Sequence, residues 1–96
     1  RRSWSERMPL ELTIVTPTDE AYSGPVDSVV LPGSEGDFGV LPQHERLLTA
    51  LREGEVEIKT PAGTRKAKIS EGFADVSGSE VVVMVTSCAF GDAAKR

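Results

Sequence analysis

The sequence predicts a single all-β domain, a flattened β-sandwich or barrel of about ten short strands. Apolar and polar residues alternate in several short segments, with the period of two that is typical of a strand. Proline and glycine separate these segments, and no long segment before the final AFGDAAKR favours a helix. The chain has 96 residues, which fits one domain with one hydrophobic core.

The first half of the chain contains three candidate strands. Apolar residues alternate with polar ones from Leu10 to Ile14, so we expect one buried face and one exposed face. Residues 29–31 and 38–41 form two further apolar runs, and a proline follows each. Leucines within residues 47–51 have a spacing that suits one helical turn, but the segment is too short for a stable helix. We therefore expect a connection or a short strand there.

The second half predicts two hairpins. Residues 55–59 and 66–69 alternate on either side of Pro61-Ala62-Gly63, where proline fixes φ and glycine permits a positive φ. Residues 73–76 and 81–85 form the second pair, joined at Ser77-Gly78-Ser79. The unbroken apolar run of residues 81–85 predicts a strand that is covered on both sides.

The composition excludes several classes of protein. The net charge of −4 argues against nucleic-acid binding and against direct binding to anionic membranes, so membrane association is expected only through partners. The basic run at Arg65, Lys66 and Lys68 alternates with apolar residues, as on a solvated strand face. A lone cysteine, Cys88, follows an apolar run and is expected to be a buried structural thiol.

The ends of the chain are expected to lie outside the folded domain. The basic segment RRSWSER lacks the apolar stretch of a secretion signal and is interpreted as a cloning scar, an upstream start or the stub of a targeting peptide. We therefore divide the chain into an N-terminal extension or remnant (1–8), a sandwich domain (9–90) and a short tail (91–96).

No catalytic, cofactor or metal site is predicted. His44 is the only histidine, and no nucleophile or second ligand can be placed beside it from the sequence. Local packing or a role in an interface both remain open for it. Glu35 and Asp37 lie in the glycine-rich segment GSEGDFG, residues 33–39, which we call the acidic turn. This segment lacks the Lys and Ser/Thr of a phosphate-binding loop, and its two acids would repel phosphate.

One long motif resembles a known family. Ser23-Gly24-Pro25-Val26, followed by GSEGDFGVLPQHERLLTAL at residues 33–51, is similar to the signature of the epsilon subunit of F-type ATP synthases, the counterpart of the mitochondrial delta subunit. Residues 10–90 match the family in order and spacing. Two departures occur: Gln43 replaces a glycine, and Glu45-Arg46 replace a small residue and a proline. The second departure puts in doubt any close contact that the family makes there.

The resemblance implies a non-catalytic rotor subunit that couples rotation of the c ring to the gamma subunit of the central stalk. By motif, the c-ring candidates are Glu35 and Asp37, and the gamma-facing candidates are Asp37, His44 and Thr49. It also implies a peripheral position on the cytoplasmic face of the bacterial inner membrane, or on the matrix side of the mitochondrial inner membrane or the stromal side of the thylakoid. The helical hairpin that follows the sandwich in this family is expected to be absent, because only residues 91–96 remain.

Two other functions are compatible with the residues alone. A free-standing β-sandwich that binds a small ligand or a peptide fits the strand pattern equally well, and only the motif separates it from the rotor subunit. A small hydrolase that uses His44 with a carboxylate is disfavoured, because no catalytic triad can be assembled.

Overall fold

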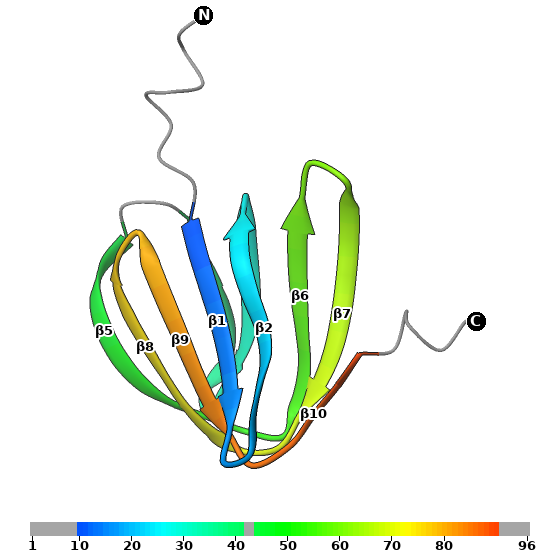
Figure 1. Ribbon diagram of the computed structural model, residues 1–96. Coiled ribbons are helices and arrows are strands. Elements are labelled where there is room, and N and C mark those ends of the chain that lie inside the picture. The colour runs from blue at the N-terminus through cyan, green and yellow to red at the C-terminus, as the bar shows by residue number, and fades with distance from the viewer. Residues whose placement is uncertain (1–9, 42–43, 91–96) are drawn as a thin grey trace, which may run out of the picture.

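The structure, a computed structural model, describes residues 10–41 and 44–90. Ten strands and no helix occupy these ranges, which confirms the all-β class (Figure 1). The expected extension at residues 1–8 and the tail at 91–96 lie outside the described residues, as does Gln43. The strands are β1 (Leu10–Thr16), β2 (Asp19–Val26), β3 (Ser28–Gly33), β4 (Gly36–Val40), β5 (His44–Leu51), β6 (Gly54–Thr60), β7 (Gly63–Ile69), β8 (Gly72–Gly78), β9 (Glu80–Val85) and β10 (Cys88–Phe90).

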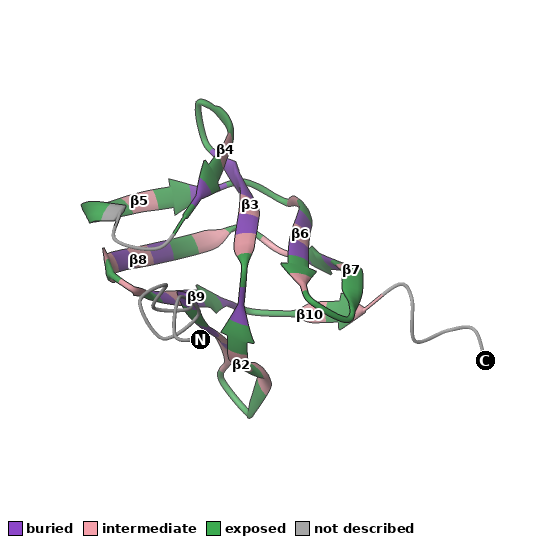
Figure 2. Ribbon diagram, turned by 90° about the horizontal axis from the view of Figure 1, so that it is seen from above, coloured by how far each residue is buried: buried purple, intermediate pink, exposed green. Residues whose placement is uncertain are grey.

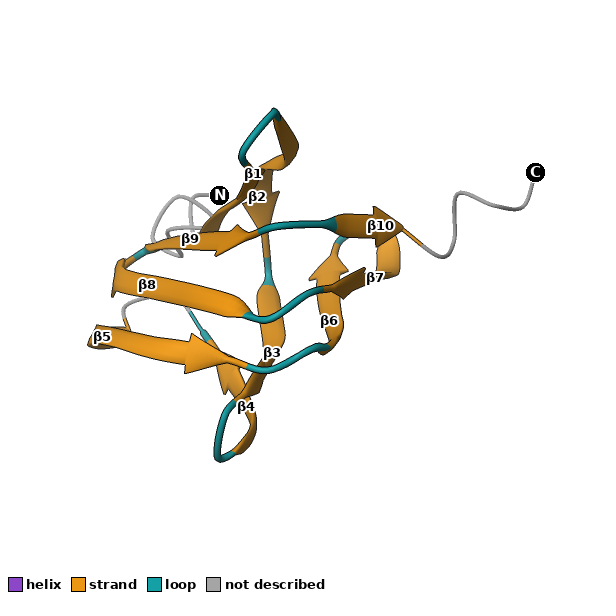
Figure 3. Cartoon of the chain, turned by 90° about the horizontal axis from the view of Figure 1, so that it is seen from below, coloured by secondary structure: helices purple, strands orange, loops and turns teal. Residues whose placement is uncertain are grey.

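The strands form one sheet that is bent into two layers. Their order is β10-β7-β6-β3-β5-β8-β9-β1-β2, and β4 pairs with the free side of β3. A single residue pair, Gly33 with Leu51, joins β3 to β5, so the sheet turns there from one layer to the other (Figure 3). All described pairings are antiparallel except β1 with β9. The body measures 39 × 34 × 24 Å, a flattened sandwich as predicted.

The core lies between the layers and is made by the alternation seen in the sequence. Leu10, Leu12 and Ile14 of β1 are fully buried, and Val56 and Ile58 of β6 meet them from the other layer in the same core cluster. Complete burial of such a side chain contributes about 1.5–3 kcal/mol. In the part of the chain that the structure describes, no polar or charged side chain is buried.

Both predicted hairpins are confirmed. In the β6–β7 turn the Thr60 hydroxyl donates to the Gly63 carbonyl oxygen at 3.0 Å and accepts from the Ala62 amide at 3.2 Å. Between β8 and β9, Gly78 has a φ of +62°, which an L side chain rarely adopts. The leucine-rich segment at residues 47–51 is strand, within β5.

Two expectations about apolar runs were wrong. Strand β9 is covered on one side only: Val81, Val83 and Val85 are buried, whereas Met84 is 40% exposed because no layer packs on that face. The run at residues 38–41 is shorter than predicted, because β4 ends at Val40 and Leu41 is 63% exposed.

The interpretation of Arg65 as part of a solvated face was also wrong. Arg65 points to the same side of β7 as the buried Ala67 and Ile69. Its guanidinium carbon lies 5.8 Å from the Tyr22 ring centroid and 4.5 Å from the Phe90 ring centroid. The arginine therefore fills the gap between the two edge strands, β2 and β10, neither of which the sequence pattern predicted.

Candidate functional site

The acidic turn forms the first candidate surface. It joins β3 to β4, and this hairpin projects from the body of the sandwich (Figure 2). Glu35 lies at the exposed tip and Asp37, also exposed, lies in β4. Both residues line a hollow together with Thr49 of β5. Three of the four residues predicted to bind partners are therefore brought together.

His44 is the fourth residue and lies apart from the other three. It begins β5, where its backbone pairs with Gly78, whereas Thr49 pairs with Ala74 near the end of the strand. About 17 Å of extended strand separates two residues at this spacing. The side chain of His44 lies outside the part of the chain that is described. The structure thus places two of the predicted gamma-facing residues, His44 and Thr49, toward opposite ends of β5, while the third, Asp37, lies in β4.

Glycine allows the acidic turn to be this tight. Gly36 has a φ of +131°, which L side chains rarely adopt. A Cβ atom on Gly33 would stand 2.7 Å from the Gly36 carbonyl oxygen and 2.9 Å from the Phe38 ring. The hairpin is therefore packed closely, beside its turn, around a position that only glycine fits.

Arg52 belongs to this surface, although sequence reasoning did not select it. Its Nη2 lies 2.7 Å from Asp37 Oδ1, which makes an ion pair and a hydrogen bond between the two side chains. Its Nε donates to the Gly33 carbonyl oxygen at 3.1 Å. Residues 37 and 52 are far apart in the chain, and only the pairing of β3 with both β4 and β5 brings them together. No local sequence signal could have revealed this contact.

A second candidate surface is an exposed apolar area on the outer side of the β5-β8-β9-β1 layer, which we call the apolar face. Phe73 pairs across the sheet with Ala50 on one side and Met84 on the other, so these side chains form one continuous row. Leu48 is 67% exposed and Phe73 is 55% exposed. An exposed apolar area of this kind typically marks an interaction site. The apolar face consists of Val15, Leu48, Ala50, Phe73, Val82 and Met84, and it also carries one acid, Asp75, which pairs with Leu48 and Val82.

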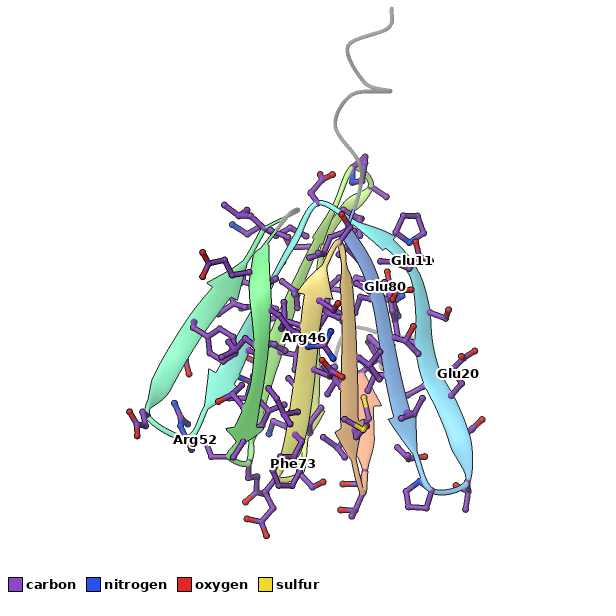
Figure 4. All side chains as sticks on the ribbon, turned by 90° about the vertical axis from the view of Figure 1, so that its left-hand side faces the viewer. Glu11, Glu20, Arg46, Arg52, Phe73 and Glu80 are labelled. Atoms are coloured by element: carbon purple, nitrogen blue, oxygen red, sulfur yellow. The ribbon has the colours of Figure 1, made fainter. Side chains whose placement is uncertain are left out.

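A groove of about 670 Å³ lies at one end of the apolar face. Phe73 and Met84 line its floor with the ends of β1 and β5, and Phe73 lies at the same end of the layer as Arg52 (Figure 4). The sequence analysis missed this surface because it predicted that β9 is buried on both faces. An unbroken run of valines does not show which face of the strand is exposed. The lining residues are Val15, Thr16, Pro17, Ala50, Leu51, Glu71, Gly72, Phe73, Met84, Val85 and Thr86.

The opposite end of the same layer is polar. Glu11 of β1 and Glu80 of β9 lie side by side across a parallel strand pair, and both are exposed (Figure 4). On the neighbouring strands the Arg46 guanidinium donates to the Ser77 hydroxyl at 3.5 Å. Polar groups therefore border the apolar face at this end, as they do in the rim of a protein interface.

The described residues show no arrangement suited to catalysis. No group of three or more His, Cys, Asp or Glu among them could hold a metal ion. Burial raises the pKa of the Cys88 thiol, which is the opposite of what a nucleophilic cysteine requires. Cys88 was expected to be buried, but it is only half-buried, and it packs against the core. Residues 10–41 and 44–90 also contain no helix with the length and apolar content needed to cross a bilayer.

Comparison with known proteins assigns the family. Residues 9–91 match the model of the ATP synthase, Delta/Epsilon chain, beta-sandwich domain. The chain belongs to this family. It is 45% identical to the ATP synthase epsilon chain of Caulobacter vibrioides, over 78% of this chain and 87% of the relative. It is 42% identical to the ATP synthase epsilon chain of Helicobacter acinonychis, over 84% of this chain.

Two solved structures contain a chain with the same sandwich fold. A chain of the Euglena gracilis mitochondrial ATP synthase OSCP/F1/c-ring assembly superposes with a TM-score of 0.80 at 26% identity, over 85% of this chain and 53% of the other. A chain of the Tetrahymena thermophila mitochondrial ATP synthase central stalk/c-ring has the same fold, with a TM-score of 0.71 at 13% identity, over 85% of this chain and 66% of the other. The present delta/epsilon-type chain spans only 66% of the Helicobacter relative.

Proposed function

We propose that this delta/epsilon-type domain is a non-catalytic part of the rotor in a proton-translocating F-type ATP synthase, where it couples rotation of the c ring to the gamma subunit. Its family membership supports this role. So does its similarity to a chain of the Euglena F1/c-ring assembly. A coupling subunit needs a separate contact for each of two partners.

The observation that carries the proposal is the presence of two unlike surfaces on one rigid sandwich. The apolar face occupies part of the outer side of the β5-β8-β9-β1 layer. The acidic turn projects with the β3–β4 hairpin of the other layer (Figure 2). Apolar burial supplies most of the free energy in a lasting protein contact, whereas exposed charge contributes mainly orientation and rate of encounter. We assign the apolar face to the gamma subunit and the acidic turn to the c ring.

The residues implied by the family motif fit this assignment as follows. By the family motif, Glu35 and Asp37 are both proposed c-ring contacts, and Thr49 lies in the hollow beside them. Asp37, His44 and Thr49 remain the proposed gamma-facing positions, to which the apolar face adds Leu48 and Phe73. Thr49 lies on the opposite side of β5 from Leu48, so gamma would have to contact both faces of this strand to meet both side chains.

The domain limits and the location are proposed on the same basis. Residues 9–90 form the functional unit, preceded by an extension (1–8) and followed by a tail (91–96). In the assembled motor the unit is peripheral, held at the cytoplasmic face of the bacterial inner membrane through its partners. The alternatives are the matrix side of the mitochondrial inner membrane and the stromal side of the thylakoid.

A co-purification experiment tests the proposal. A tagged copy of this chain is added to membranes that carry an F-type motor depleted of its epsilon subunit, and the recovered proteins are identified. We expect the gamma subunit and the c ring to be recovered together, and ATP-driven proton pumping to increase. Recovery of the chain alone, with unchanged pumping, would refute the rotor role.

A free-standing binding module is the second candidate, and the groove beside Phe73 is the observation that favours it. A volume of about 670 Å³ lies within the range of small-molecule sites. In that case the isolated chain would bind an apolar ligand at this groove, and Phe73→Ala would abolish the binding. Under the rotor proposal, the gamma subunit displaces any such ligand.

A further inference from the structure

We propose that Arg52 is a positioning residue that fixes the acidic turn and neutralises Asp37, so that Glu35 alone presents a free carboxylate to the c ring. This inference rests on the proposed function for the identity of the partner. It differs from the motif-based expectation, in which Glu35 and Asp37 contribute alike.

The contacts of Arg52 reach both arms of the β3–β4 hairpin. Its guanidinium bonds to Asp37 in β4 at 2.7 Å through Nη2 and to the Gly33 carbonyl oxygen in β3 at 3.1 Å through Nε. Its backbone amide donates to the Pro32 carbonyl oxygen at 2.9 Å. Arg52, which directly follows β5, therefore holds the hairpin at three points, and we call its pairing with Gly33 and Asp37 the clamp.

A fourth bond joins the same two segments. The Ser34 amide, at the start of the turn, donates to the carbonyl oxygen of Ala50 at 3.1 Å. On the other side of Pro32, a Cβ atom on Gly54 would lie 3.0 Å from Pro32 Cβ, which shows how closely this segment is packed. The end of β3 beside the turn is thus fixed, and among these contacts only the Arg52 guanidinium reaches the Asp37 side chain.

The two acids of the turn differ in their surroundings. The Asp37 carboxylate is paired with Arg52, so its charge is balanced within the chain. Within residues 10–41 and 44–90, no ion pair or side-chain hydrogen bond is found for Glu35. A cationic or polar group on a partner can therefore meet Glu35 without displacing an internal bond, whereas binding to Asp37 would compete with Arg52.

The ion pair between Arg52 and Asp37 is exposed, so its loss is expected to change local hydrogen exchange more than global stability. The side chains of Arg52 and Asp37 are 50% and 62% exposed, so the pair adds little to global stability. Its loss should instead release the turn locally, because the guanidinium no longer joins Gly33 to Asp37. We therefore expect Arg52→Gln to leave the unfolding midpoint almost unchanged and to increase hydrogen exchange of the Ser34 amide in the isolated chain.

Binding to the c ring provides the second measurement. Retention of the chain on epsilon-depleted membranes is measured against salt concentration for Glu35→Gln, Asp37→Asn, Arg52→Gln, the double variant Asp37→Asn plus Arg52→Gln, and the exchange Asp37→Arg plus Arg52→Asp. We expect each single substitution at the clamp to weaken retention about two- to fivefold, and the double variant to be no weaker than either single one. The exchanged pair should recover retention. Only Glu35→Gln should lower the salt dependence.

The outcomes separate this inference from the proposed function. Additive losses in the double variant, or no recovery by the exchanged pair, would show that Asp37 contacts the partner directly and would overturn the inference. If the Ser34 amide exchanges hydrogen at the same rate in Arg52→Gln as in the unmodified chain, then Arg52 does not fix the turn. If the unmodified chain fails to bind the membranes, the proposed function fails, and with it the role of Glu35. The exchange measurement on the isolated chain still decides whether Arg52 fixes the turn.

Discussion

The Arg65 guanidinium lies 4.5 Å from the ring centroid of Phe90, and the Phe90 ring stacks on Tyr22 at 5.9 Å. Tyr22 belongs to β2 and Phe90 to β10, the two strands at the ends of the sheet order. The three side chains therefore connect the two ends of the sheet, between which the described residues show no strand pairing. A cation over an aromatic ring supplies attraction that an aliphatic residue cannot.

We predict that Phe90→Leu lowers the free energy of unfolding by about 0.5–1 kcal/mol, because it keeps most of the apolar volume and removes the aromatic face. Urea denaturation measures the loss. Arg65 makes further contacts, so the specific interaction is isolated by a double-mutant cycle with Arg65→Gln. A coupling energy of zero between residues 65 and 90 would contradict the prediction.

Strand β8 begins at a position that excludes any side chain. A Cβ atom on Gly72 would overlap the carbonyl oxygen of Met84 and lie 2.9 Å from Val85 Cγ1. Gly72→Ala must therefore push β8 away from β9, and we predict a loss of about 1–3 kcal/mol in the free energy of unfolding. Gly39→Ala is the matched control, because nothing lies within 4 Å of the added atom. Equal stabilities of the two variants would refute this explanation.

The sequence predicted the strands that have one clear apolar stripe. Alternation from Leu10 to Ile14 and at Val56 and Ile58 gave the correct buried faces, because the side-chain period of a strand is two. Strand β2 was not predicted, because it contains Gly24 and Pro25, which normally disfavour a strand. Because β2 lies at the edge of the sheet, it can accommodate proline: an edge strand does not need every backbone amide to donate a hydrogen bond.

The candidate surfaces were only partly predictable. The acidic turn was visible as a glycine-rich motif, whereas Arg52 reaches Asp37 only after β3 has paired with two other strands. Similarly, the sequence showed Arg65 only as one charge in a basic run, whereas in the fold its guanidinium lies close to the rings of Tyr22 and Phe90. Contacts of this kind depend on tertiary pairing and leave no local trace in the sequence.

Burial of the Cys88 thiol makes a prediction about pH. Desolvation raises its pKa in the folded state, so the folded chain holds the thiol proton more tightly than the unfolded chain does. The contribution of the protonated thiol to the free energy of unfolding is fully present below the pKa of the unfolded thiol. It is lost as the pH rises through the pKa of the folded thiol. Hence the unmodified chain should lose more stability than Cys88→Ser in the alkaline range above the unfolded pKa. Parallel stability profiles in urea titrations would contradict the prediction.

The last prediction concerns the apolar face. In the free chain Leu48 is 67% exposed, so Leu48→Ser should change the unfolding free energy little, whereas Phe73→Ser should lose somewhat more because its ring is 55% exposed. If gamma covers both side chains, each substitution removes about 1.5–3 kcal/mol of binding, which corresponds to roughly ten- to hundredfold weaker affinity. Titration of purified gamma with each variant measures the effect, and Lys66→Ala, exposed on the other layer, is the control. Equal affinities for all variants would show that gamma binds elsewhere.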